Sequence, residues 1–477
     1  MPLFQGFIGP MSTSRSRTVD DQATVNLYCE QVESGLGKDR YALYGRPGNT
    51  LFSQVAGGQG QAMLEIQGRC FACIGGSLYE INAYGDYSKI GPVGTTAPVS
   101  MAANPSQLIV TSTLGGGWIL PLDNAAGYGR IASPGYPLNA DSVTYMDSYF
   151  IVTQGGTQEF FISAPNDGTS WSALDFASKE GYPDYVVAVQ MVRRQLWVFG
   201  SETSEIWWDS GNANFPFQPI QGALVQVGLA AVRSPAIVGN GLFWLGQNNR
   251  GTAVAFAEQN FAPIRVSNHA VEAAWEAYPV ISDAIGYGYE ENGHTFYVLS
   301  FPTAQATWVL DTKTGFWHQW DWWNSVTGSS EAALARFHCF CFNEHLTLDW
   351  KFGNIYKQSL NTYTDAGSVI RRIRRAPHVD QSKHRLRHVR LQLDIEIGTT
   401  PVGTNPTYSM RFSDDGGFTW SNELIRYVGQ AGKYANQLIW RQLGSSRDRV
   451  YEISSTANCN FAWAAAYLET VPSNELQ

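Results

Sequence analysis

Short apolar strands separated by polar turns recur through most of the chain. Between residues 70 and 365, an apolar strand, a Gly-, Asn- or Asp-rich turn and an aromatic strand repeat seven times. Successive repeats start 37, 42, 46, 47, 53 and 44 residues apart, close to the ~40–50 residues of a four-stranded propeller blade. Each repeat has one apolar face to bury, so the pattern predicts an all-β fold, a β-propeller of about six to eight blades. The repeats begin at Phe71, Leu108, Phe150, Leu196, Phe243, Phe296 and Phe340.

The two ends of the chain do not follow this repeat. Residues 1–60 are rich in Ser, Gly and Asp and lack sustained periodicity, so we expect a mostly extended N-terminal arm there. Residues 61–370 then form the propeller. After a basic linker at 371–390, strands with one apolar face each predict a small C-terminal β-sandwich-like domain over residues 391–477.

Helix signals are scarce. The best candidate is residues 267–278, where apolar side chains fall at helical spacing. Ser267 or Asn268 can cap its first N–H groups. We expect one short helix inserted in a blade.

Charged residues are scarce and aromatic residues are abundant. Charged residues make up 15% of the chain, against a usual ~25%, and aromatic residues 13%, with 16 Trp. Two interpretations stay open. Neighbouring subunits could cover much of the surface, because interface cores lose charge and gain aromatics, or the aromatics could simply serve the strands.

Basic residues are concentrated in one segment. Residues 371–390 carry eight Lys or Arg and one Asp, a net charge of +7, which leaves −16 on the rest of a chain whose total is −9. The segment could neutralise DNA phosphates, but the acidic remainder and the lack of a recognition module favour an exposed connector or a docking surface for an acidic partner. The expected docking residues are Arg371, Arg372, Arg374, Arg375, Arg385, Arg387 and Arg390.

The six cysteines predict neither a disulfide scaffold nor a metal site. Two close pairs, Cys70 with Cys73 and Cys339 with Cys341, lie in strand-like runs. Cys70 and Cys73 are three apart, so in a strand they point to opposite faces, and neither pair has a His at finger-like spacing. We expect buried free thiols, no metal and no cofactor.

A turn motif stands out near the C-terminus. The segment SDDGGFTW at 413–420 matches the Asp-box pattern S-x-D-x-G-x-T-W of hairpins in sialidases and other propellers. In such a turn the carboxylate accepts N–H groups, Gly supplies unusual dihedral angles and Trp packs beneath the loop. We therefore predict a structural role for Ser413, Asp415, Gly417, Thr419 and Trp420.

No catalytic template is complete in the sequence. GxSxG, HExxH and GxxxxGK[ST] are absent. A sialidase-like site would need several Asp boxes, three convergent arginines and a Tyr/Glu nucleophile pair, and one complete box is present. We expect no enzyme and no catalytic residue. The chain also shows neither a basic-then-apolar leader nor an apolar run of ~18 residues, so we expect a soluble protein made in a cytoplasm.

Five longer segments, in order over nearly the whole chain, carry a family resemblance. Together they resemble the packaged-DNA stabilisation proteins of short-tailed bacteriophages. The segments are SRSRTVDDQATVNLYCEQVESGLGKDRYALYGRPGNTLF, RVSNHAVEAAW, ENGHTFYVLSFPTAQATWVLDTKTGFWHQW, RFSDDGGFTWSNE and RQLGSSRDRVYEIS.

The resemblance implies a structural virion protein, the tail hub or nozzle, also called a tail accessory factor. Such a protein is expected to form a six-fold homo-oligomeric ring beneath the portal and its adaptor, to close the exit after packaging and to conduct DNA during ejection. The implied partners are the head-to-tail connector, a tail needle or plug, tailspike or tail fibre proteins, and double-stranded DNA passing without sequence specificity. No catalytic residues belong to the family pattern. The implied location is the phage tail, after assembly in the host cytoplasm.

A second function class stays open, a carbohydrate-binding or sialidase-like β-propeller that recognises host-surface glycans. Aromatic propeller faces do bind sugars, and a tail component lies close to a cell envelope. Ring formation would favour the hub, whereas a monomer that binds or cleaves glycans would favour the alternative.

Overall fold

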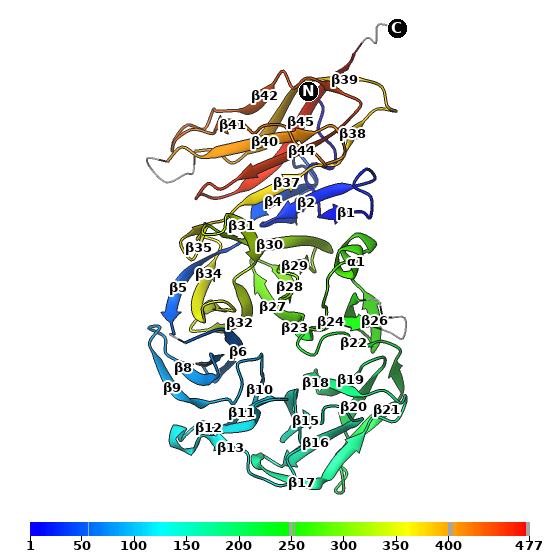
Figure 1. The fold of residues 1–477 in the computed structure, drawn as a ribbon, viewed down its shortest axis with the longest axis vertical. Helices are drawn as coiled ribbons and strands as arrows, with labels where there is room; N and C mark the ends of the chain where they lie inside the picture. Colours follow the sequence, from blue (N-terminus) through cyan, green and yellow to red (C-terminus); the bar gives the residue numbers. More distant parts are fainter. Residues whose placement is uncertain (56, 248–250, 252, 399–403, 474–477) are drawn as a thin grey trace.

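Two β-rich bodies lie one above the other along the long axis of the molecule (Figure 1). The structure, a computed structural model, describes residues 1–55, 57–247, 251, 253–398 and 404–473. The larger body is a ring of small sheets, and the smaller is a pair of sheets packed face to face. The predicted all-β propeller and C-terminal β-sandwich are confirmed.

Seven antiparallel four-stranded blades form the propeller in the described part of the chain, within the predicted range. The first strands of most neighbouring blades contact one another around the axis. In chain order the blades are β6–β9 (Gly60–Ile66, Arg69–Ile74, Ser77–Ile81, Tyr87–Pro92), β10–β13 (Ser100–Ala103, Gln107–Ser112, Gly116–Pro121, Gly129–Arg130), β14–β17 (Val143–Met146, Tyr149–Thr153, Glu159–Ala164, Asp167–Ser178), β18–β21 (Val186–Val192, Gln195–Gly200, Ser204–Asp209, Phe217–Val225), β23–β26 (Ala236–Val238, Gly241–Gln247, Val254–Gln259, Ala262–Arg265), β27–β30 (Ile285–Glu291, His294–Phe301, Ala306–Asp311, Phe316–Asn324) and β32–β34 (Ala335–Cys341, Glu344–Asp349, Asn354–Ser359) with β5 (Gly48–Gln54). Short additions are β22 (Gly228–Leu229), β31 (Ser329–Ala332), β35 (Thr364–Asp365), β36 (Ser368–Val369) and a 3-10 turn at Ala125–Gly127.

A strand from the N-terminal part of the chain completes the last blade. β5 pairs antiparallel with β34, with Gln54 opposite Asn354 and Gly48 opposite Ser359. The two ends of the propeller are therefore joined by backbone hydrogen bonds rather than by a covalent link.

Alternation along a strand decides which neighbour each side chain meets. In β7, Cys70 and Ala72 pack against the last blade, whereas Phe71 and Cys73 pack against Leu108 and its neighbours in the next blade. This is the period of two that the sequence showed. The alternation also places Cys70 and Cys73 on opposite faces of β7. All six cysteines are free and buried.

The predicted helix is confirmed as α1 (His269–Glu276). Asn268 caps it, because its side-chain oxygen accepts a hydrogen bond of 3.0 Å from the backbone N–H of Val271. Val271 and Trp275 are buried against the propeller. Among the described residues, no helix has the length and apolar character needed to cross a membrane.

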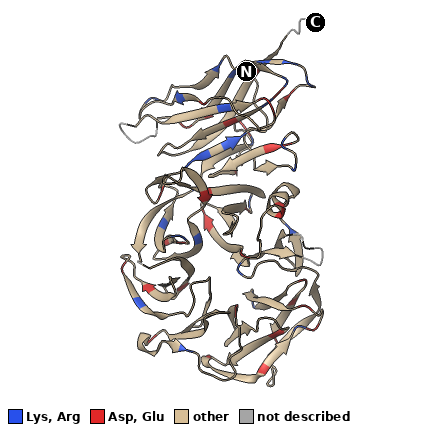
Figure 2. Ribbon diagram, in the orientation of Figure 1, with Lys and Arg blue, Asp and Glu red and all other residues tan. Residues whose placement is uncertain are grey.

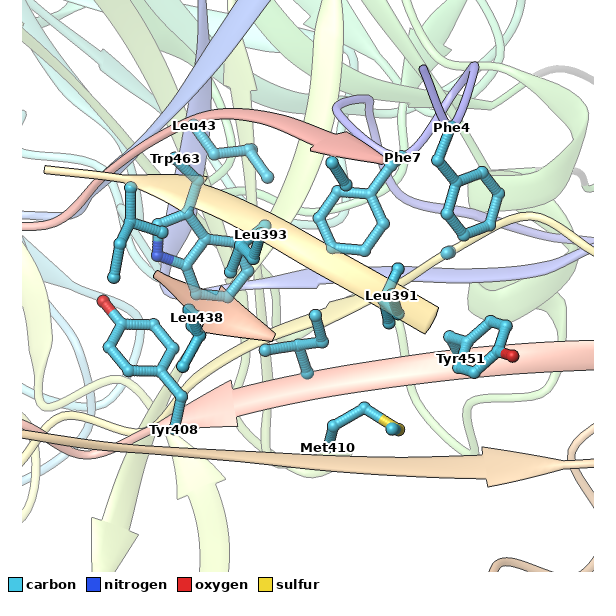
Figure 3. Close-up of a cluster of buried hydrophobic side chains, with 14 of the residues drawn as sticks. Phe4, Phe7, Leu43, Leu391, Leu393, Tyr408, Met410, Leu438, Tyr451 and Trp463 are labelled. Atoms are coloured by element: carbon cyan, nitrogen blue, oxygen red, sulfur yellow. The ribbon is translucent and has the colours of Figure 1, made fainter. Parts of the chain in front are cut away.

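The sandwich consists of two sheets around one apolar core (Figure 3). Side chains from both sheets meet there, including Leu391, Tyr451 and Trp463. Phe4 and Phe7 from the start of the chain are buried in the same core. One sheet holds β3 (Leu27–Gln31), β4 (Tyr41–Gly45), β45 (Ala462–Pro472), β39 (Leu386–Ile395), β42 (Leu438–Arg441) and β43 (Ser445–Ser446), and the other holds β1 (Ser12–Thr13), β2 (Asp21–Val25), β37 (Arg372–Arg375), β38 (Val379–Asp380), β44 (Asp448–Ser455), β40 (Thr407–Ser413) and β41 (Leu424–Tyr427).

The two bodies share a continuous sheet. β30 of the propeller pairs with β2 through Val25 and Gln319, and β2 pairs with β37 of the sandwich. Strands β1 to β5, all within residues 1–60, thus reach both bodies. The domain limits expected at 60, 370 and 390 stay predictions.

Candidate docking site around the basic segment

The basic segment lies where the propeller meets the sandwich. Figure 2 shows its first half as a blue strand, β37, at this junction. β37 is held between β2 and β44. A strand in the middle of a sheet alternates its side chains between two faces, so neighbouring arginines have different surroundings.

Arg374 is buried and holds the N-terminal loop in place. Its side chain is 0% exposed and donates hydrogen bonds to the backbone carbonyls of Gly6 (2.8 Å), Phe7 (2.5 Å) and Pro10 (2.9 Å). It also donates to Thr24 Oγ1 at 2.8 Å. Burial lowers the pKa of Arg374 to about 10, which leaves it charged at neutral pH.

Arg372 is buried on the same face of β37. It is 1% exposed, and its guanidinium lies 4.1 Å from the ring centre of Phe461. Its Nη1 donates to the carbonyl of Ala457 at 3.2 Å. Burial lowers the pKa of Arg372 to about 10. Arg372 and Arg374 therefore do not belong to the expected docking surface, because both side chains are buried and donate hydrogen bonds within the molecule.

Arg375 and Arg371 are partly buried and engaged within the molecule. Arg375 donates to Asp21 Oδ2 at 2.6 Å and to Glu452 Oε2 at 3.0 Å. Burial raises the pKa of Asp21, against the lowering influence of Arg375. Arg371 lies over the ring of Trp323, 5.7 Å from its centre.

The other three arginines lie on the sandwich, away from β37. Arg385 and Arg387 are exposed, and Arg390 is partly buried and bonded to Glu469 Oε2 at 2.7 Å. Arg385 donates to Ser445 Oγ at 3.0 Å. The structure does not bring the seven arginines together: the four at 371–375 are buried or partly buried at the junction, and of the other three only Arg385 and Arg387 are exposed.

The Asp-box segment forms a tight turn between β40 and β41. Asp415 Oδ1 accepts hydrogen bonds from the backbone N–H of Phe418 (3.0 Å) and Thr419 (2.9 Å), and Oδ2 accepts from Thr419 Oγ1 (2.6 Å). The hydrogen bonds from Thr419 hold the pKa of Asp415 far below its usual range. Gly417 has φ +92°, a conformation that other residues rarely adopt.

Trp420 connects this turn to the basic strand. The guanidinium groups of Arg375 and Arg411 lie 5.0 and 4.7 Å from the centre of its indole ring. Arg411 also donates to Glu452 Oε1 at 2.7 Å, so two arginines share this buried carboxylate. The sequence showed the Asp box and the basic segment separately, and only the fold shows that they pack together.

The propeller axis contains a small central cavity. Its volume is about 260 Å³, and it is lined by side chains of the innermost strands of the blades.

Comparison with known proteins returns two family matches that together span most of the chain. Residues 5–363 match the model described as bacteriophage P22 Gp10, beta-propeller, and residues 371–471 match bacteriophage P22 Gp10, beta-sandwich. A search of curated proteins finds no significant match.

Several solved structures are also similar to the chain. The WD40 domain of Doa1 has 11% identity and a TM-score of 0.42, covering 66% of this chain and 97% of its own. The WD40 domain of Pan2 from Neurospora crassa has 11% identity and a TM-score of 0.39, covering 66% and 96%. BamB from Moraxella catarrhalis has 11% identity and a TM-score of 0.36, covering 65% and 97%.

Proposed function

Because the chain belongs to the bacteriophage P22 Gp10 family, and so is a phage structural protein of the P22 type, we propose that it is the hub, or nozzle, of the phage tail. In this role it closes the portal exit, retains the packaged DNA and conducts it during ejection. The observation that carries the proposal is the match of both bodies, propeller and sandwich, in order along one chain.

The size of the central cavity supports a ring of subunits. The first strands of most neighbouring blades contact one another around the axis, and their side chains line the small space between them. A duplex does not fit there, so a conducting channel requires several copies of the protein around it. Heterologous contacts that close by rotation form such rings. We propose a homo-hexamer, with duplex DNA passing between the subunits without sequence specificity.

Exposed apolar side chains on two neighbouring blades offer a surface for such contacts. Leu174 and Phe176 on β17 and Trp208 on β20 are 85%, 39% and 45% exposed. Phe176 also lines a groove of about 540 Å³ between β17 and β21. Apolar patches of this kind mark interaction sites on many proteins.

The sandwich offers a different surface for the other tail proteins. We propose that Arg385 and Arg387 dock an acidic face of one of them, the connector, the needle or plug, or a tailspike or fibre. Assembly takes place in the host cytoplasm, and the protein is then part of the virion. The proposed role needs no catalytic residue, and we propose that the protein is not an enzyme.

Electron microscopy of the purified protein and of phage particles tests the hub proposal. The protein alone or with its connector should form closed rings, and particles made without it should package DNA and then lose it. A strictly monomeric protein that binds or cleaves glycans on an array would overturn the proposal in favour of the glycan-binding alternative.

A further inference from the structure

A second pocket lies at one mouth of the propeller axis. Its volume is about 460 Å³, and loops that lead into the innermost strands form its wall. Arg233 and Ile285 line both this pocket and the central cavity, so the two spaces adjoin. We call it the axial pocket. Leu114, Asp283 and Arg336 also line it.

Arg336 brings an unpaired positive charge to the wall of the axial pocket. Its side chain is only 7% exposed, yet it has no hydrogen bond or ion pair with any residue in the described ranges. Its Nε and Nη2 are buried without a partner. Its one strong contact is the ring of Trp350, whose centre lies 4.6 Å from the guanidinium carbon. A buried charge is normally paired.

Asp283 and Asp349 are the carboxylates that act on Arg336, and neither forms an ion pair with it. Asp349 accepts hydrogen bonds from the backbone N–H of Phe352 at 3.1 Å and from Tyr356 Oη at 3.0 Å. Asp141 is taken by Arg233, which donates to its Oδ1 at 2.7 Å. Asp283 Oδ2 accepts the backbone N–H of Thr303 at 2.8 Å, and its Oδ1 is buried without a partner. The pocket thus keeps one guanidinium without an acceptor and one carboxylate oxygen without a donor.

We propose that the axial pocket binds a carboxylate group, carried by a free amino acid or by an acidic segment of a protein chain. Arg336 holds the carboxylate through its planar pair of N–H donors, and Asp283 Oδ1 accepts an N–H group of the same ligand. A phosphate dianion fits less well, because one unpaired cation faces it and Asp283 repels it. The site does not depend on the proposed ring.

Calorimetric titration of the full chain tests this with probes that carry one side-chain carboxylate. Acetyl-Gly-Glu-Gly-amide stands for an inserted segment and L-glutamate for a free ligand. Acetyl-Gly-Gln-Gly-amide and inorganic phosphate are the controls. We expect one or both carboxylate probes to bind at least about tenfold more tightly than either control. Binding of the Glu peptide indicates an inserted protein segment, and binding of L-glutamate indicates a free amino acid. Tighter binding of phosphate, or no binding of either carboxylate probe, overturns the proposal.

Two variants place the binding in the axial pocket. Arg336→Gln should abolish it without lowering Tm, because the change removes an unpaired buried charge. Leu114 is 80% exposed, so Leu114→Glu should fold normally and weaken binding several-fold, less so at high salt. Leu114→Gln is its neutral control and should bind as the parent does. Unchanged binding in both Arg336→Gln and Leu114→Glu would overturn the assignment.

Discussion

A buried arginine holds distant parts of this chain together. Arg374 satisfies three backbone carbonyls of a loop that precedes it by more than 360 residues. A loop without regular structure needs such donors, because buried carbonyls without partners are destabilising. The same guanidinium is thus a structural element and not a ligand-binding group.

Replacing Arg374 should strongly destabilise the sandwich. In Arg374→Met, the carbonyls of Gly6, Phe7 and Pro10 lose their donors, so we expect a loss of at least about 3 kcal/mol in free energy of unfolding. Urea denaturation measures it, and proteolysis should then cleave the N-terminal loop. Arg385→Met, on an exposed residue, is the control and should change stability by less than about 0.5 kcal/mol. Equal midpoints for the two variants would contradict the assignment.

The Asp-box turn should contribute stability that depends on pH. The pKa of Asp415 is lower in the folded protein than its usual value. Its stabilising effect is therefore present above about pH 4 and is lost as the pH falls through the folded-state pKa. We expect Asp415→Asn to lower the Tm by a few degrees at pH 7. The difference in Tm between the parent and the variant should become smaller in acid. Thermal melts across pH measure it, and a pH-independent difference would argue against this account.

At the scale of elements, pairing between distant strands decides the architecture. β5 completes a blade whose other strands lie some 300 residues later, and β2 joins that propeller to the sandwich. Each pairing closes a very long loop, which slows folding more than it weakens the folded state. The N-terminal segment thus completes the propeller and joins it to the sandwich.

A methyl group at Gly48 should open the last blade. A Cβ there would lie 2.4 Å from the carbonyl oxygens of Thr362 and Thr364, so the backbone must shift. We expect Gly48→Ala to cost about 1–3 kcal/mol and to speed amide hydrogen exchange along β34. At Gly129 a Cβ meets nothing within 4 Å, so Gly129→Ala is the matched control. Unchanged exchange along β34 in Gly48→Ala would show that β5 does not close the ring.

At the scale of the whole molecule, the positive charge of the basic segment is divided between the buried junction and the exposed surface of the sandwich. The chain has a net charge of −9, and much of the positive charge of its basic segment is inside the junction. Lys383, Arg385 and Arg387 are the exposed part of this charge, on the sandwich. Exposed charges act mainly on the rate at which partners associate.

Removing the charges of Arg385 and Arg387 should slow tail assembly without unfolding the protein. In Arg385→Gln/Arg387→Gln, we expect an unchanged Tm and slower, salt-sensitive incorporation into particles. Lys89→Gln/Arg130→Gln removes the same charge from two exposed positions on the propeller strands β9 and β13 and is the control. Ring occupancy on particles, counted by electron microscopy over time, measures the effect. Normal incorporation of the first variant would leave the sandwich arginines without a docking role.

The local pattern of the sequence determined the elements of this protein. Strand alternation and turn residues act over about ten residues, so the blade repeat and α1 with its Asn268 cap could be predicted, as could the tight Asp-box turn. The order of recognisable segments also indicated the family. None of these inferences required knowing which distant strands pair.

Only the tertiary structure decided which residues are available to a partner. In the sequence, the arginines at 371–375 could be expected to alternate between the two faces of a strand. Which face is buried depends on β2, which pairs with this strand from about 350 residues earlier and helps to cover Arg372 and Arg374. Phe7 in the sandwich core and the unpaired Arg336 at the propeller axis also result from such packing. Local sequence sets backbone conformation, whereas burial and charge pairing depend on neighbours that only the folded chain brings together.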